Sequence, residues 1–169
     1  MIYIEWCRHD RQMKIIEDCE IWFADVSCLV RNEVNRWRPN LKNKPSDEVI
    51  HAITKNNTDS GIPVMPRQFP IGKWNITSVD SRDDEYRKPY IIMTNAFQEL
   101  EEWKLDKVGG YDKPTGNKVL DYKYGLHFSQ SNTTTGCIKI DNMVDLLRLV
   151  QSITREFDKG NVPIIEVVA

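Results

Sequence analysis

The chain has 169 residues, a formal charge of −2 and a pI near 5.9, and we expect it to form one domain spanning residues 1–169. This charge gives no support to a nucleic-acid partner, which normally requires a basic face. No apolar run approaches the roughly 20 residues of a membrane helix, so we expect no membrane span. The first ten residues lack a basic leader followed by a long apolar stretch. We therefore expect a protein made in the cytoplasm without a signal peptide.

The N-terminal part alternates apolar and polar residues in short runs. This alternation predicts a meander of antiparallel strands at 1–6, 12–16 and 20–26. Proline and asparagine then break the pattern over 31–61, where only 46–54 has the composition of a short helix. So long a connection is unusual in a compact domain, and we interpret it as a loop or flap over a site.

The remaining two thirds of the chain also favour strands, with one exception. A single amphipathic helix is predicted at 141–159, capped by Asp141 or Asn142. Segment 96–103 is either a strand or a short helix, and the glycine- and proline-rich segment 108–116 is predicted to be a loop. Further strands are expected at 69–79, 90–94, 121–128, 137–140 and 162–168. The fold class is therefore mainly β (α+β), a curled sheet or sandwich on which the late helix packs.

Four cysteines, at positions 7, 19, 28 and 137, leave the redox state open. An even count permits disulfides, but the wide spacings match no familiar framework. Cys7 and Cys19 stand among apolar residues and are expected to be buried small hydrophobes. No pair of cysteines or histidines has the spacing of metal ligands, so we expect neither a metal nor a cofactor.

The most informative stretch runs from His127 to Cys137, ten positions later. His127 closes a strand-like run, a polar loop follows, and Gly136-Cys137 opens the next apolar run. A strand-loop-strand hairpin would bring the two side chains together, and a cysteine needs a nearby base to become a thiolate nucleophile. Gly136 allows a sharp turn at which backbone N–H groups can face a developing oxyanion.

This order of residues resembles the catalytic domain of the L,D-transpeptidases, the YkuD-like fold. That family has His, a variable loop, Ser or Thr, usually a second His, and then Gly-Cys and a hydrophobic residue. Here the chain reads His127, loop, Thr134-Thr135-Gly136-Cys137. The opening meander and the strand near 68–76 also fit, so the resemblance spans most of the chain, although only the segment from His127 to Cys137 is specific.

The chain departs from the family pattern in the length of the loop and at two residues, and the loop points to one branch of the family. The loop before Cys137 is shorter than in the cell-wall enzymes, and Thr135 and Phe128 replace a usual histidine and a usual small residue. The shorter loop resembles the compact L,D-transpeptidase-like toxins that type VI secretion delivers. Those toxins lack a signal peptide because the secretion machine exports them.

The resemblance implies a chemistry for each matching residue. Cys137 would attack the diaminopimelate carbonyl of a peptidoglycan tetrapeptide and expel D-alanine, with His127 as the base. Gly136 and Thr135, with Thr134 beside them, would form the oxyanion and substrate region. A backbone carbonyl just after His127, or Ser129, would orient the imidazole. Water, a free D-amino acid or a second stem would take the thioester. The implied partners are tetrapeptide stems, a cognate immunity protein and a type VI delivery component, and the implied place of action is the target-cell periplasm.

Other interpretations of the same residues stay open. A Gly-Cys-Ile at the start of a strand is, taken alone, typical of a buried structural cysteine. A non-enzymatic wall-binding, phage or secretion-apparatus module could keep the fold without the chemistry. A different cysteine hydrolase acting on a small amide is a third possibility. The joint occurrence of His127 and Cys137 at the family spacing favours the catalytic interpretation.

Overall fold

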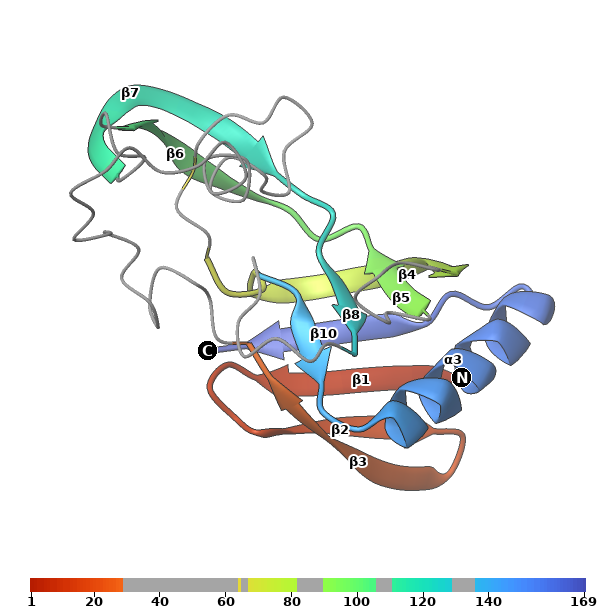
Figure 1. Cartoon of the computed structure of the whole chain (residues 1–169). Coiled ribbons are helices and arrows are strands. Elements are labelled where there is room, and N and C mark those ends of the chain that lie inside the picture. The colour runs from red at the N-terminus through yellow and green to blue at the C-terminus, as the bar shows by residue number, and fades with distance from the viewer. Residues whose placement is uncertain (29–63, 65–66, 82–89, 106–110, 129–135) are drawn as a thin grey trace.

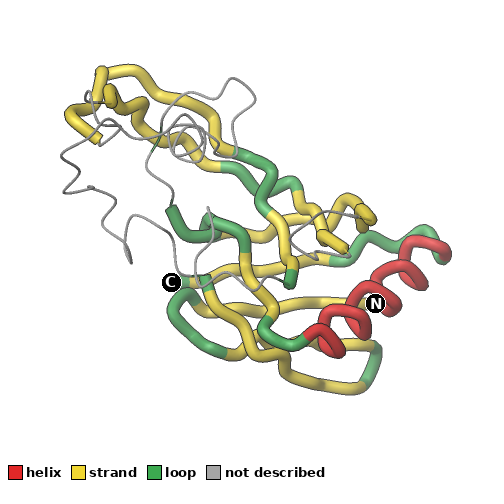
Figure 2. Tube along the Cα trace, in the orientation of Figure 1, coloured by secondary structure: helices red, strands yellow, loops and turns green. Residues whose placement is uncertain are grey.

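The computed structural model describes residues 1–28, 64, 67–81, 90–105, 111–128 and 136–169 (Figure 1). These residues form strands and one helix, and the prediction of a mainly β protein is confirmed (Figure 2). The strands before the helix are β1 (Ile2–Cys7), β2 (Gln12–Glu17), β3 (Glu20–Ser27), β4 (Gly72–Ser81), β5 (Tyr90–Thr94), β6 (Gln98–Leu105), β7 (Tyr111–Asp121), β8 (Gly125–His127) and β9 (Ile138–Ile140). Helix α3 (Met143–Asp158) and strand β10 (Ile164–Val168) complete the order.

The main sheet closes on itself as a barrel with the strand order β1-β10-β4-β5-β8-β9-β3-β2. Strands β1 and β10 pair in parallel, as do β8 and β9, and the other neighbours pair antiparallel. Closure leaves no unpaired edge within this sheet. A closed barrel is thus the particular form that the expected curled sheet takes. Strands β6 and β7 form a separate hairpin that stands away from the barrel (Figure 1).

The core fills the barrel because alternate residues of each strand point inward. On β1 the residues Ile2, Ile4 and Trp6 are buried, and the Trp6 indole N–H donates to the Asp10 carbonyl at 3.0 Å. Helix α3 packs on β1, β4 and β9, and adds its own buried apolar residues Leu146, Leu149, Val150 and Ile153 to the core.

The N-terminal meander and the late helix are confirmed by β1 to β3 and by α3. Asn142 caps the helix: its side-chain oxygen accepts a hydrogen bond from the Val144 N–H at 2.8 Å. Of the segment 96–103, which could have been strand or helix, residues 98–103 are strand and belong to β6. No helix among the described residues is long and apolar enough to cross a membrane.

The prediction of a loop over 108–116 is wrong from Tyr111 onward, because β7 begins there and pairs with β6. Proline is tolerated in a two-stranded ribbon, since each strand has an outer side on which no ladder hydrogen bond is needed. Pro114 stands opposite Trp103, beside a register shift. The predicted flap at 31–61, with its short helix, lies outside the described residues.

The cysteines differ from expectation as well. No disulfide joins any two of them. Cys19 is exposed, at the turn between β2 and β3, and Cys7 is half-buried with its thiol 3.0 Å from the Ala169 carbonyl. The prediction that Cys7 and Cys19 are buried is therefore wrong. Alternate strand positions and turn positions face solvent even where the neighbouring residues in the sequence are hydrophobic.

Candidate active site

His127 ends β8, and Cys137 stands one residue before the neighbouring strand β9. The two strands pair in parallel, with Leu126 opposite Ile138 and His127 opposite Lys139. Leu126 and Ile138 belong to the core, so the residues beside them point outward. His127 therefore lies on the outer face. The same alternation, continued one residue before β9, would place Cys137 on that face as well. The expected hairpin between the two strands is wrong, because a hairpin joins antiparallel strands.

The parallel register sets the separation of the two candidate residues. Two residues of rise and one strand spacing place their Cα atoms about 8 Å apart, a distance that an imidazole and a thiol reaching toward each other can span. Both side chains are nearly covered, with 6% of His127 and 7% of Cys137 exposed. If the two side chains turn toward each other, a covered thiol and imidazole are suited to nucleophilic chemistry away from bulk water.

The tautomer of His127 follows from its neighbour. Its Nδ1 lies 3.2 Å from the Phe128 carbonyl oxygen, which can only accept a hydrogen bond. Nδ1 therefore carries the proton, and Nε2 is left as the basic nitrogen. This carbonyl is the orienting group that the resemblance offered. The alternative, Ser129, and the residues Thr134 and Thr135 lie outside the described residues.

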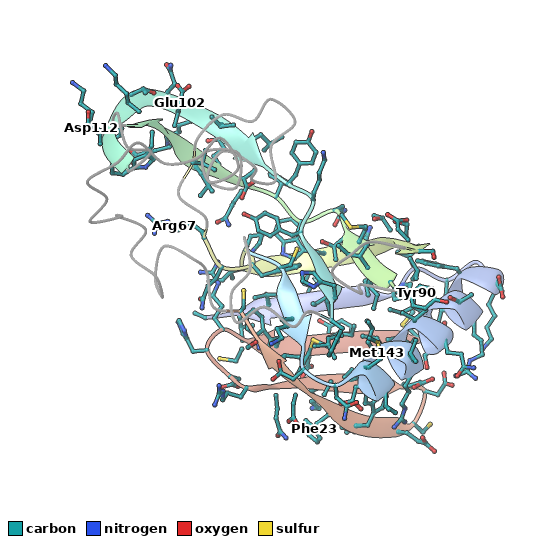
Figure 3. All side chains as sticks on the ribbon, viewed as in Figure 1. Phe23, Arg67, Tyr90, Glu102, Asp112 and Met143 are labelled. Carbon is teal, nitrogen blue, oxygen red and sulfur yellow. The ribbon has the colours of Figure 1, made fainter. Side chains whose placement is uncertain are left out.

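Gly136 forms a tight corner immediately before Cys137. Its φ of +123° lies in the region that favours glycine. A Cβ atom at this position would stand 2.6 Å from the Arg67 carbonyl oxygen and 2.6 Å from Cε1 of Tyr124. Its carbonyl accepts the Cys28 thiol at 3.3 Å. Arg67 belongs to the segment that leads into β4 (Figure 3). The residue before the candidate nucleophile is thus fixed on two sides.

Tyr124, which the sequence did not single out, is the principal buried side chain of this region. Its ring is fully buried and meets Phe69 edge-on, with centroids 5.5 Å apart. Its hydroxyl donates to the Asp121 carboxylate and accepts from Gln98 Nε2 at 2.7 Å. Burial, and then the negative charge of Asp121, raise the pKa of Tyr124 above the ordinary tyrosine range. The phenol therefore stays protonated and serves as a donor.

Hydrogen bonds continue from Tyr124 into the barrel. Gln98 Nε2, on β6, also donates to the Gln68 carbonyl at 3.1 Å. Arg8, after β1, donates to the Phe69 carbonyl at 2.7 and 2.9 Å. Gln68 Nε2 donates in turn to the Cys28 carbonyl at 3.2 Å. The network ties the β6–β7 hairpin, the segment before β4 and the Gly136 corner into one unit.

The sequence analysis did not identify Tyr124, Asp121 and Gln98, because single buried polar side chains do not recur at a regular spacing in the sequence. The one available signal was Asp121, an acid that precedes the apolar run of β8 in a segment predicted to be strand. Among the described residues, no three His, Cys, Asp or Glu side chains gather where they could hold a metal ion.

Comparisons with known protein families, with curated proteins and with solved structures gave no match. Any functional conclusion therefore depends on the residues of the site and on the resemblance of its motif.

Proposed function

We propose that this protein is a cysteine-dependent peptidoglycan-modifying enzyme of the L,D-transpeptidase type. The supporting observation is that β8, which ends at His127, pairs in parallel with β9, which begins one residue after Cys137, and that the tight corner at Gly136 directly precedes Cys137. The mainly β fold with one packed helix is compatible with that family. The substrate is the tetrapeptide stem, cut between diaminopimelate and D-alanine.

His127 and Cys137 can supply the proton transfers and the nucleophile that this reaction needs. His127 Nε2 takes the proton of the Cys137 thiol, and the thiolate attacks the diaminopimelate carbonyl carbon. The tetrahedral intermediate collapses, the C–N bond breaks, and the imidazolium protonates the departing D-alanine nitrogen. Backbone N–H groups around Gly136 and Cys137 would stabilise the oxyanion. Water, a D-amino acid or a second stem then attacks the thioester and restores the thiol.

The biological role that fits this proposal is that of an antibacterial effector. Such an enzyme would be delivered by type VI secretion, would act in the target-cell periplasm and would need an immunity protein in its producer. Removal or exchange of D-alanine would deplete the donor stems that crosslinking requires. This role follows from the resemblance of the short loop between His127 and Cys137 to the toxin branch.

The test is mass spectrometry of disaccharide tetrapeptide incubated with the pure protein, with and without a free D-amino acid. We expect loss of D-alanine, or its replacement by the added amino acid. Cys137→Ala and His127→Ala should abolish both reactions while the fold is kept. Cys19→Ala is the matched control, because it removes an exposed thiol far from the site in sequence and should leave the rate unchanged. Full activity in either site variant would refute the proposal.

One observation favours a second candidate, a non-enzymatic wall-binding module. Only 7% of the Cys137 side chain is exposed, which is also typical of a structural cysteine. In that case the tetrapeptide would stay intact and the thiol would show no enhanced reactivity. The pH dependence of alkylation separates the two candidates.

A further inference from the structure

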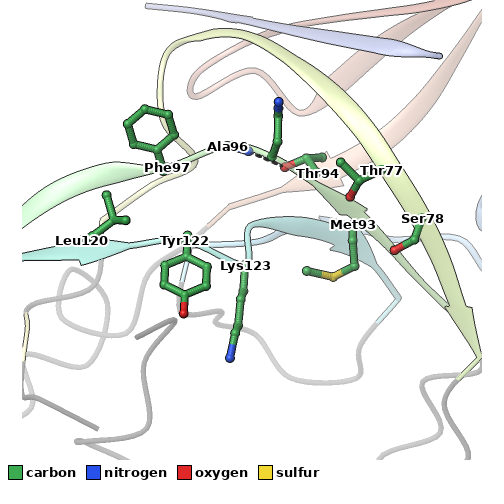
Figure 4. Close-up of a pocket in the computed structure, with 10 residues that line it drawn as sticks. Thr77, Ser78, Met93, Thr94, Ala96, Phe97, Leu120, Tyr122 and Lys123 are labelled. Atoms are coloured by element: carbon green, nitrogen blue, oxygen red, sulfur yellow. Dashed lines mark hydrogen bonds between the residues drawn. The ribbon is translucent and has the colours of Figure 1, made fainter. Parts of the chain in front are cut away.

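A pocket of about 420 Å³ opens on the barrel beside the base of the β6–β7 hairpin. Figure 4 shows Met93 of β5, Phe97 and Leu120 of the hairpin base, and Lys123 of the segment before β8 around it. Phe97 and Leu120 are large apolar residues with 52% and 50% of their surface exposed. The Phe97 ring is held edge-on by Trp74, with centroids 5.5 Å apart. The pocket thus has a supported apolar wall that is open to solvent.

The pocket lies on the same outer face as the candidate nucleophile. Met93 is paired with Gly125, and its Sδ would stand 3.3 Å from a Cβ placed on Gly125. Continuing the β8–β9 register by one residue places Cys137 on the other side of Gly125. Met93 of β5 and Gly125 of β8 are thus paired, and Cys137, one residue before β9, extends the same row. Two strand spacings separate the ends of that row, so the pocket begins about 10 Å from the thiol.

Lys123 is the charged member among the described residues that line the pocket. Its ammonium lies 5.5 Å from the centre of the Tyr122 ring. Its φ of +70° is uncommon for a residue with a side chain and persists only where the surroundings hold it. A cation at the rim of an apolar wall suits a ligand that has aliphatic carbons and ends in a carboxylate.

We propose that this pocket binds the acyl-donor peptide and that Lys123 pairs with a carboxylate of that peptide. The identity of the peptide rests on the proposed function. Two carboxylates of a tetrapeptide stem lie far enough from the scissile carbonyl to reach the pocket: the diaminopimelate side chain and the α-carboxylate of the preceding glutamate. Both offer the same chemistry to an ammonium group. Lys123 is exposed, so its contribution is a moderate one, about two- to five-fold in affinity.

The experiment measures binding without turnover. The Cys137→Ala protein is titrated by calorimetry with the tetrapeptide, with its diaminopimelate-amidated form and with its glutamate-amidated form. We expect one amidation to weaken binding about two- to five-fold, and Lys123→Gln to weaken binding of the unmodified peptide equally. In Lys123→Gln that amidation should have no further effect. Lys118→Gln removes the same charge from an exposed position on the same hairpin, outside the pocket, and should change nothing.

Three results would overturn the inference: an unchanged dissociation constant in Lys123→Gln, an equal loss for all three peptides in that variant, or no binding of any peptide. The proposed function fails separately, if the protein with Cys137 intact releases no D-alanine. If binding depends on Lys123 but no D-alanine is released, the pocket is a peptide-binding site and the proposed enzymatic function is wrong. If D-alanine is released but binding does not depend on Lys123, the enzymatic function is supported and the role of Lys123 is wrong.

Discussion

Tyr124 lies against the Cα atom of Gly136, so closely that a Cβ at position 136 would be 2.6 Å from Cε1 of its ring. This contact joins the segment before β8 to the residue before Cys137. Because the Tyr124 hydroxyl is held by Asp121 and Gln98, the ring cannot move aside without breaking buried hydrogen bonds. The position of the candidate nucleophile therefore depends on a buried tyrosine.

Gly136→Ala should disrupt both the fold and the activity. The new methyl group meets the Arg67 carbonyl and the Tyr124 ring, and the positive φ adds backbone strain. We expect a loss of about 2 to 4 kcal/mol in the free energy of unfolding, measured in urea, and no release of D-alanine. Gly116→Ala is the matched control: its φ is +90° but nothing lies within 4 Å, so strain alone should cost about 1 kcal/mol. Equal losses in the two variants would show that the Gly136 corner is not tightly packed.

Tyr124→Phe keeps the ring against Gly136 and removes only the hydroxyl. The buried Asp121 carboxylate then loses a donor, and we expect destabilisation of about 1 to 3 kcal/mol. Asp121→Asn combined with Tyr124→Phe should be less destabilising than the sum of the two single changes, because the phenol and the carboxylate act as a pair. A double-mutant cycle of unfolding free energies measures this coupling, which we expect to reach about 1 kcal/mol. Additive effects would mean that the two groups contribute independently.

The sequence allowed local structure to be predicted better than pairing. Helical spacing and a capping asparagine were enough for α3, because both are properties of neighbouring residues. The single strand predicted at 121–128 is in fact the end of β7 at Asp121 and, after a break, the short strand β8. The parallel direction of β8 and β9 was not predicted either, since a period of two specifies the faces of a strand and not its partner. Glycine and proline concealed the start of β7, whose pairing with β6 outweighed its composition. The contact between Tyr124 and Gly136 joins residues twelve positions apart, and no repeating pattern in the sequence indicates it.

Alkaline pH should loosen the contact between β1 and β10. The Tyr3 hydroxyl donates to the Glu166 carboxylate, and this hydrogen bond, followed by burial, raises the pKa of Tyr3 from 10.0 to about 12. The folded state then holds the proton more tightly than the unfolded state does. Its stabilising contribution is complete below pH 10 and is lost as the pH rises through 12. We expect the free energy of unfolding to fall more steeply between pH 10 and pH 12 in the unaltered protein than in Tyr3→Phe. Parallel curves for the two proteins would contradict this assignment.

The reactivity of Cys137 distinguishes a nucleophile from a structural thiol, and the chain supplies its own reference. Cys19 is exposed on a turn, whereas Cys137 is nearly buried beside β8. If His127 activates Cys137, iodoacetamide labelling of Cys137 should have its pH midpoint below that of Cys19 in the same sample. His127→Ala should move the Cys137 midpoint upward by about one pH unit or more and leave that of Cys19 in place. Peptide mass spectrometry after timed labelling resolves the two sites. A Cys137 midpoint that does not respond to His127→Ala would favour the binding module, in which the thiol only packs.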